Sequence, residues 1–330
     1  MAPPAEAIKA SSGSGWKWSA WSTKKKATII TAILFILALA LGLGIGLGVG
    51  LKDDDNDNSD DSDNNNNNNN GGGGNTGNNG TDSGDLWQPA VGTSWQIVLK
   101  YALNDTSVDV PVYDIDLFDN PVSTINELHD LDRKVICYFS AGTYEDWRQD
   151  ASDFPSEDIG DNLDEWEGES WVNISSSAIR DIMIQRLDLA QEKGCDGVDP
   201  DNVDGYDNQN GLGLTQDDSI DYMRFLAREA RDRGLSIGLK NAGAIISDVL
   251  DDMHWSVNEQ CAQYDECDVY AAFVNAGKPV FHIEYPKGDD VNNEKDVSSS
   301  ERRGACNFED SGEFSTLIKN MNLDNWYQDC

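Results

Sequence analysis

Polar side chains follow short apolar runs at several places in the chain. Asp201 and Asn202 come after GVDP, and Asn258, Glu259 and Gln260 come after WSV. Two facing carboxyl groups, one protonated and one ionised, are what the cleavage of a glycosidic bond requires. We therefore predict that Asp201 and Glu259 form a catalytic pair and that the neighbouring amides orient a sugar.

Other polar residues also end apolar runs, and we expect them to contact a substrate. In a barrel of parallel strands the carboxyl ends of the strands meet on one face, where active sites lie. An acid at a strand end also commonly caps the next helix, so for any single acid that structural role is the stronger interpretation. The number of polar strand ends favours a shared site. The predicted substrate-binding residues are Asp114, Asp116, Tyr138, Asn202, Lys240, Asn241, Asn258, Gln260, Glu284 and Tyr285.

The surroundings of the two acids suggest different roles. Asp201 lies between Pro200 and Asn202 in a polar segment, where hydrogen bonds favour the ionised form that a nucleophile or base needs. Glu259 follows the apolar run 255–257, where partial burial raises the pKa of a carboxyl group and favours a general acid. The reverse assignment remains open at this point.

A run of aspartates raises the alternative of a metal site. Asp199, Asp201, Asp204 and Asp207 lie in one segment, as in a calcium-binding loop. The EF-hand register fails, because Val203 occupies the position of the third ligand and no glutamate occupies the twelfth. The three histidines are dispersed and lack the spacing of metal ligands. We therefore expect neither a metal nor another cofactor.

Short β-branched runs alternate with helical stretches from Trp87 onward. The stretches 178–193 and 216–233 have apolar residues at helical spacing, and a glycine, which commonly stops a helix, follows each. This alternation predicts parallel strands joined by helices. Its repetition over about 245 residues favours a (β/α)8 TIM-type barrel over an open doubly wound sheet. Strands are predicted at 95–99, 110–115, 134–139, 197–199, 236–239, 255–257, 279–283 and, as an eighth, 323–327.

The amino-terminal part of the chain has a composition that cannot build a core. Residues 27–51 carry no charge and are long enough to cross a bilayer. Three lysines precede them, so the positive-inside rule places residues 1–26 in the cytoplasm and predicts a single-pass type II signal anchor in the cell membrane. A cleaved signal peptide is the alternative, although no small-x-small cleavage site follows. Residues 52–85 predict a disordered tether, and 86–330 an extracellular domain.

The chain is strongly acidic, with a formal net charge of −36. Residues 86–330 hold 50 of the 60 acids and 18 of the 24 bases. Such a domain repels nucleic acid and anionic lipid, so we expect no nucleic-acid partner, and it concentrates a cationic ligand near its surface. Solubility in an acidic or salty exterior explains the charge equally well.

Six cysteines, all after the apolar stretch, form an even set that can pair in an oxidising compartment. A disulfide between Cys261 and Cys267 would fix the segment after Glu259, and Cys306 is a candidate partner for Cys330. Cys137 and Cys195 are either buried thiols or a third pair. Sequence alone leaves the pairing open.

Six motifs in order over residues 95–330 resemble one known family. They are YDIDLFD, ICYFSAGTYEDWR, GCDGVDPDNVDGY, GLSIGLKNA, NEQCAQYDEC and GKPVFHIEY, and they resemble the endo-α-1,4-polygalactosaminidases, glycoside hydrolase family 114. The resemblance implies a (β/α)8 barrel, hydrolysis of α-1,4-linked galactosamine polymers such as fungal galactosaminogalactan, and no required cofactor. The paired acids of the PDN and NEQ motifs fall on Asp201 and Glu259. The first strand and the polar insert 288–303 depart from the pattern.

The leading hypothesis is therefore an endo-acting hydrolase of a cationic aminosugar polysaccharide at the cell surface. A non-catalytic barrel that binds wall polysaccharide is the chief alternative, but a binding protein has no use for a matched pair of acids. A transferase that remodels the polymer would use the same residues, and only its products separate it from a hydrolase.

Overall fold

The computed structural model describes residues 86–330 except 164, 165, 290 and 310. The predicted cytoplasmic tail, membrane anchor and tether lie outside these residues. Within the described part of the chain, no helix is long and apolar enough to cross a membrane.

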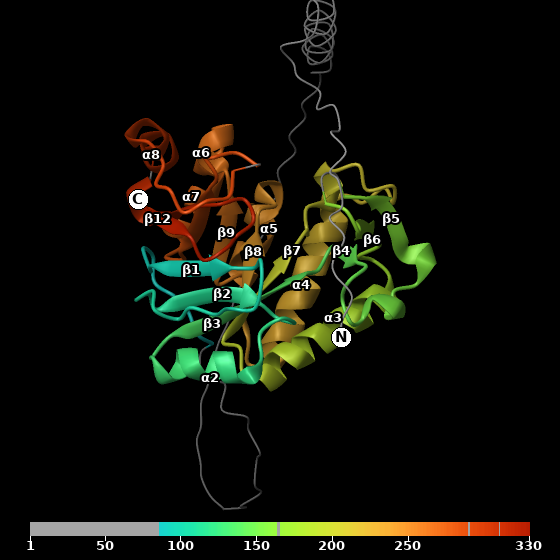
Figure 1. Cartoon of the computed structure of the whole chain (residues 1–330). Helices are drawn as coiled ribbons and strands as arrows, with labels where there is room; N and C mark the ends of the chain where they lie inside the picture. Colours follow the sequence, from blue (N-terminus) through green and yellow to red (C-terminus); the bar gives the residue numbers. More distant parts are fainter. Residues whose placement is uncertain (1–85, 164–165, 290, 310) are drawn as a thin grey trace, which may run out of the picture. The chain divides into compact units, whose positions relative to one another are not determined.

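Parallel strands form one curled sheet, in the order β1-β2-β3-β7-β8-β9-β10-β11, with the short strand β12 antiparallel to β11 (Figure 1). Strand neighbours in this sheet follow the order of the chain, as repeated strand–helix units require. The α/β arrangement is consistent with a (β/α)8 glycoside hydrolase fold. The strands are β1 Trp95–Val98, β2 Val112–Asp116, β3 Lys134–Ser140, β7 Gly197–Asp201, β8 Ser236–Lys240, β9 Trp255–Glu259, β10 Val280–Glu284, β11 Ser315–Lys319 and β12 Tyr327–Asp329.

The first and last parallel strands approach each other through side chains. The indole nitrogen of Trp95 donates to the carbonyl of Ser315 at 2.8 Å, and the Lys319 ammonium donates to Gln96 at 2.9 Å. The amide of Leu99 donates to the carbonyl of Leu323 at 3.0 Å. These contacts join segments that lie at opposite ends of the sheet order.

Seven of the eight predicted strands are confirmed, and the eighth, at 323–327, is wrong. Leu323 has a positive φ of 49° in a turn, and Tyr327 begins the antiparallel β12. The last parallel strand is β11, whose short apolar run STLIK pairs with β10. Asp324 and Asn325, which lie between Leu323 and Tyr327, favour a turn and agree with the absence of a strand at this position.

Helices pack against the sheet and enclose most of the apolar core (Figure 1). The predicted helices 178–193 and 216–233 are confirmed as α3 and α4. Gly194 ends α3 with a φ of 86°, and Thr215 and Asp218 form a capping box that starts α4. The helices are α2 Val122–Asp130, α3 Ser177–Lys193, α4 Gln216–Asp232, α5 Ile246–Val249, α6 Cys261–Tyr264, α7 Cys267–Asn275 and α8 Ser299–Cys306, with 3-10 turns at Ala151–Asp153, Ser156–Asp158, Gly205–Asp207, Gly243–Ile245, Leu250–Asp252 and Ser311–Glu313.

A second core fills the concave side of the curled sheet. It contains Trp95, Trp255 and Phe281, which are all buried. Gly197 and Gly238 lie on the two strands before β9, and a Cβ atom at either position would overlap the indole of Trp255. The two glycines therefore make room for the largest side chain of this core.

A small antiparallel sheet, in the order β4-β6-β5, interrupts the strand–helix pattern between β3 and α3. Its strands are β4 Thr143–Glu145, β5 Ile159–Asn162 and β6 Glu169–Val172. Figure 1 shows it beside the large sheet, at the right of the view. The sequence analysis did not predict this sheet.

All six cysteines form disulfides. Cys137 in β3 pairs with Cys195 before β7, so these two cysteines form a third disulfide and are not buried thiols. Cys261 pairs with Cys267, and Cys306 at the end of α8 pairs with Cys330. The last bond joins the end of the chain to its last helix.

Candidate active site

A cleft of about 1370 Å³ lies at the carboxyl ends of the parallel strands. Its walls come from segments that follow most of these strands and from the small sheet. Both predicted catalytic acids and seven of the ten predicted substrate-binding residues line it. These are Asp116, Tyr138, Asp201, Asn202, Lys240, Asn241, Glu259, Gln260 and Tyr285.

Asp201, Lys240 and Glu259 are the last residues of three successive strands, β7, β8 and β9. The Lys240 ammonium lies between the two acids, 3.0 Å from Asp201 Oδ2 and 3.2 Å from Glu259 Oε2. Those two oxygens are therefore separated by no more than the sum of the two distances, 6.2 Å. The two acids can reach the same bond of a ligand.

Lys240 is a buried cation held by its carboxylate neighbours. Burial alone would lower the pKa of its ammonium, but Asp201 and Glu259 raise it well above its usual value. The side chain therefore stays charged and offsets the repulsion between the two acids. Its nitrogen also lies 5.0 Å from the centre of the Tyr138 ring.

Hydrogen bonds fix the carboxylate of Asp201. The Tyr138 hydroxyl donates to Oδ2 at 2.9 Å, and the amide of Asn202 donates to Oδ1 at 2.8 Å. Asn202 has a φ of 59°, and its side-chain amide donates to the Ser140 and Thr143 hydroxyl oxygens at 3.1 and 3.2 Å. This loop conformation keeps Asp201 in one orientation.

Glu259 is held by donors from two neighbouring segments. The Tyr285 hydroxyl donates to Oε1 at 2.5 Å, and the Asn241 amide donates to Oε2 at 3.2 Å. The backbone amide of Glu259 in turn donates to Asn241 Oδ1 at 3.0 Å. The side chain is thus oriented on both sides.

The pKa of Glu259 is lowered, whereas the sequence predicted that burial would raise it. Burial would raise the pKa, but the Lys240 cation and the hydrogen bonds from Tyr285 and Asn241 together bring it below its usual value. The apolar run before Glu259 could not reveal this, because the lowering groups come from β8 and from the residue after β10.

Three predicted substrate-binding residues lie away from the cleft lining, which corrects the expectation of direct contact. Asn258 is buried with its side chain on the opposite face of β9 from its neighbour Glu259, as strand alternation requires. Glu284 accepts the amide of Ala262 at 2.8 Å and caps α6. Asp114 is fully buried one inward position before Asp116.

Asp114 and Asp199 form a buried acidic pair among the side chains below the catalytic acids. Burial and the charge of Asp199 raise the pKa of Asp114 well above its usual value. Burial also raises the pKa of Asp199, to about 7, although Lys240 opposes the shift. The pair therefore holds protons more tightly than free carboxyl groups do.

Asp116 lines the cleft but already has a cationic partner. Two guanidinium nitrogens of Arg148 donate to its carboxylate at 3.1 and 2.7 Å, and the amides of Phe118 and Asp119 donate to Oδ1. Its role in the described structure is to hold Arg148 and the turn after β2.

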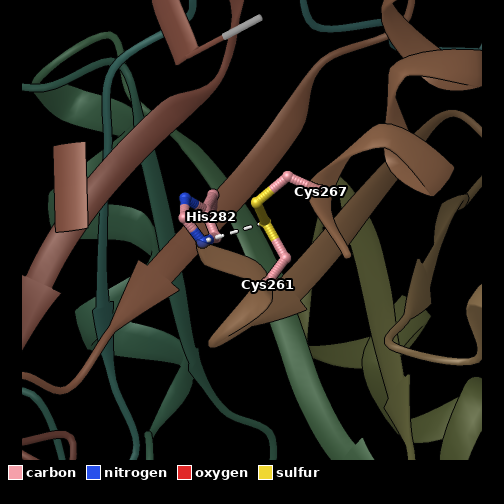
Figure 2. Close-up of side chains that lie close together, drawn as sticks. All are labelled: Cys261, Cys267 and His282. Atoms are coloured by element: carbon pink, nitrogen blue, oxygen red, sulfur yellow. Dashed lines mark hydrogen bonds between the residues drawn. A yellow bond between two sulfur atoms is a disulfide. The ribbon is translucent and has the colours of Figure 1, made fainter. Parts of the chain in front are cut away.

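The candidate calcium run does not assemble a metal centre. Asp199 is buried beneath the site, whereas Asp201, Asp204 and Asp207 line the cleft. In the described part of the chain, the group that brings three potential ligand atoms together is Cys261, Cys267 and His282 (Figure 2).

The two sulfurs of this group are joined in a disulfide, so neither is the thiolate that binds metals. Figure 2 shows the His282 ring beside the bond, with its Nε2 atom 3.3 Å from the Cys261 sulfur. The same nitrogen lies 2.9 Å from Glu284 Oε1. The disulfide, His282 and Glu284 together support the segment that directly follows Glu259.

The small sheet adds cleft residues that sequence reasoning missed. Glu145, Trp147, Trp166 and Glu169 all line the cleft, and Tyr264 does so from α6. The dense tryptophans and acids of TYEDWR and WEGESW were the available signal. Their β-sheet could not be recognised because its strands are short and separated by irregular turns.

Comparison with known protein families identifies the class of protein that has this cleft. A model of glycoside hydrolase family GH114 matches residues 77–330. The chain belongs to glycoside hydrolase family 114. The chain is therefore a glycosidase, and its two-carboxylate cleft is the arrangement that this class of enzyme requires.

Solved structures agree with the family assignment. The crystal structure of Aspergillus fumigatus Ega3, a complex with galactosamine, is 63% identical, covers 75% of this chain and 100% of its own, and has a TM-score of 0.74. The glycoside hydrolase domain of PelA from Pseudomonas aeruginosa is 12% identical, covers 71% of this chain and 98% of its own, and has a TM-score of 0.53. The latter similarity concerns the fold alone. None of the curated proteins compared with the chain matches it significantly.

Proposed function

We propose that this family member is an endo-acting hydrolase that cleaves α-1,4-linked galactosamine polymers resembling galactosaminogalactan. The observation that carries the proposal is the pair Asp201 and Glu259, held on either side of Lys240 in an open cleft. The galactosamine bound by Ega3, at 63% identity, supports the choice of sugar.

In the proposed mechanism Asp201 attacks the anomeric carbon while Glu259 protonates the departing oxygen. The glycosidic carbon–oxygen bond breaks and a glycosyl ester with Asp201 forms; Glu259 then takes a proton from the water that hydrolyses this ester. We assign this retaining course because Lys240 holds the two facing oxygens within 6.2 Å of each other, and closely spaced carboxyl groups, about 5 to 5.5 Å apart, are typical of retaining enzymes. Because Lys240 lowers the pKa of Glu259 in the free protein, bound substrate must weaken this contact before Glu259 carries a proton.

The size of the cleft supports cleavage within a polymer. Its volume of about 1370 Å³ exceeds the roughly 300 to 1,000 Å³ of a usual small-molecule site. Exposed aromatic side chains line it from separate segments, with Trp147 after β4, Trp166 before β6 and Tyr264 in α6. Such a cleft accommodates several sugar residues at once.

We extend the proposal to architecture and location. The side-chain bridges between β1 and β11 support closure of the sheet into a (β/α)8 barrel. The uncharged residues 27–51, preceded by lysines, support a type II anchor that holds the domain 86–330 outside the cell membrane. The three disulfides agree with an oxidising compartment.

The test is incubation of the purified full chain with a deacetylated and a fully N-acetylated galactosamine polymer. Mass analysis should find internal fragments of the deacetylated polymer, and NMR of early products should find the α-anomer at the new reducing end. Binding without fragments would instead indicate a polysaccharide-binding protein, and longer recombined chains would indicate a transferase.

A further inference from the structure

The small sheet carries two exposed tryptophans into the wall of the cleft. Trp147 follows β4 and Trp166 precedes β6; each is 53% exposed, and both line the cleft. An indole is a large apolar surface, and its exposure in a groove is typical of a ligand-binding surface rather than of packing. A flat sugar ring is a ligand that can cover such a face.

Trp147 packs on backbone that only glycine provides. Gly168 has a φ of 93°, and a Cβ atom there would lie 3.0 Å from Cζ3 of the Trp147 ring. The Asp146 amide also donates to the Gly168 carbonyl at 3.1 Å, so the segments before and after the turn are joined. The exposed Trp147 indole therefore lies close to the backbone of the segment that precedes β6.

Two glutamates face each other across the same strands, but only one has a cationic partner. Glu145 and Glu169 are paired in the β4–β6 register, and both are nearly buried. Arg148 lies 2.8 Å from Glu145. In the residues that the structure describes, Glu169 makes no ion pair and accepts a hydrogen bond from the Thr143 hydroxyl at 3.0 Å.

Glu169 thus presents a nearly buried carboxyl group to the cleft without an ion-pair partner of its own, although the Arg148 cation beside Glu145 partly offsets its charge. Burial, followed by the charge of Glu145, raises its pKa to about 7. An ammonium group placed beside it would supply the missing cation and would form charge-assisted hydrogen bonds. An N-acetyl group has no charge and leaves the carboxylate uncompensated.

A chain of hydrogen bonds connects Glu169 to the catalytic loop. Thr143 donates to Glu169, and the Asn202 side chain donates to Thr143 at 3.2 Å. Asn202 directly follows Asp201. Glu169 is therefore linked to the catalytic loop, and Trp147 and Trp166 line the same cleft.

We propose that Trp147, Trp166 and Glu169 form a subsite that selects a deacetylated galactosamine residue of the polymer next to the cleaved bond. The tryptophans stack on sugar rings, and Glu169 binds the ammonium group. This inference rests on the proposed function and deepens it, because it assigns the preference for free amines to one carboxylate.

The test measures oligomer affinity by calorimetry in an Asp201→Asn background, which prevents turnover. Adding Glu169→Gln should weaken binding of a galactosamine hexamer by at least about tenfold and should leave the affinity for an N-acetylgalactosamine hexamer unchanged. Trp147→Ala and Trp166→Ala should weaken binding of both hexamers. The matched control is Glu157→Gln, which removes an exposed acid of the same insertion outside the cleft lining and should bind both as the parent does.

The other possible outcomes of the binding experiment would overturn the subsite. Parent-like binding of the galactosamine hexamer by Glu169→Gln, or an equal loss for both hexamers, would overturn the subsite. If Glu169→Gln lowers the melting temperature and cannot be used, parent-like affinity of both exposed tryptophan variants overturns it instead. The proposed function is judged separately by turnover of the galactosamine hexamer by the unmodified chain, so an inactive chain with the expected binding pattern would reject only the hydrolase.

Discussion

Lys240 is the residue on which the electrostatics of the cleft depend. Its ammonium contacts both Asp201 and Glu259, and two further carboxyl groups, Asp114 and Asp199, are buried nearby. One cation cannot neutralise four acids, so the deeper pair holds protons more tightly than free carboxyl groups do. Asp201 and Glu259 are left as the chemically active pair.

The hydroxyl of Tyr285 offers a test of the role of Glu259. Burial raises the pKa of Tyr285 well above its usual value, so the hydroxyl keeps its proton and donates a hydrogen bond to Glu259. Tyr285→Phe removes a hydrogen bond that lowers the pKa of Glu259, so that pKa should rise. If Glu259 is the general acid, its protonated form survives to higher pH, and the alkaline limb of kcat/KM moves upward.

The pH profile of kcat/KM checks this shift, with Tyr138→Phe as the matched control because its hydroxyl contacts Asp201 and not Glu259. The control should leave the alkaline limb in place. Movement of the acid limb in Tyr285→Phe would mean that Glu259 works in its ionised form, and the two roles would be exchanged.

At the scale of elements, Gly197 in β7 and Gly238 in β8 leave the space that the indole of Trp255 occupies. Gly238→Ala places a methyl group against the indole, which is enclosed by other buried side chains. We expect a loss of about 1 to 3 kcal/mol in the free energy of unfolding from overpacking. Urea denaturation measures this loss.

Gly304→Ala is the control for that experiment, because Gly304 lies in α8 and a Cβ atom there meets open space. Alanine favours a helix over glycine, so its stability should be unchanged or higher. Equal stabilities of Gly238→Ala and the unmodified chain would show that the indole moves easily, and the account of the concave core would be wrong.

Strand parity explains which site residues could be predicted from the sequence. The predicted strands around Asp201 and Glu259 stopped two residues early, at 199 and 257, so the facing direction of the residues beyond them was unknown. Lys240 and Glu259 have the inward parity and line the cleft, whereas Asn258 is one residue out of phase and points the other way. The prediction for Glu284 is wrong for the same reason, because Glu284 is one residue out of phase on β10.

Other parts of the site depend on contacts between distant segments, which no local pattern reveals. The periodic helices and most strands were predictable because their apolar faces repeat over several residues. The subsite wall was not, because Glu145 and Glu169 become neighbours only when β4 pairs with β6. The lowered pKa of Glu259 likewise arises from Lys240 and Tyr285, which belong to other segments.

For the whole molecule, the dominant property is negative charge on the domain that carries the cleft. Residues 86–330 hold 50 acids against 18 bases, and the cleft wall adds Glu145, Glu169, Asp204 and Asp207 to the catalytic pair. A cationic polymer is attracted to such a surface over roughly a Debye length, whereas a neutral one is not.

Salt should therefore separate charged from neutral substrates. Raising the ionic strength from about 0.01 M to about 1 M shortens the Debye length from about 30 Å to about 3 Å. We expect kcat/KM for a galactosamine polymer to fall at least about tenfold, with little change for a short neutral oligosaccharide that the chain cleaves. An equal response of both substrates would mean that the charge serves solubility and not substrate capture.

The central claim is that Asp201 and Glu259 together perform the cleavage, and isosteric substitution tests it most directly. Asp201→Asn and Glu259→Gln keep the size of each side chain but remove its charge or transferable proton, so kcat should fall to background while polymer binding and the melting temperature stay near those of the unmodified chain. Glu284→Gln, at the end of the neighbouring strand but outside the cleft lining, should retain most of the activity. If either catalytic variant keeps more than about a tenth of the original kcat, a change of less than about 1.4 kcal/mol in the barrier, that residue is not catalytic.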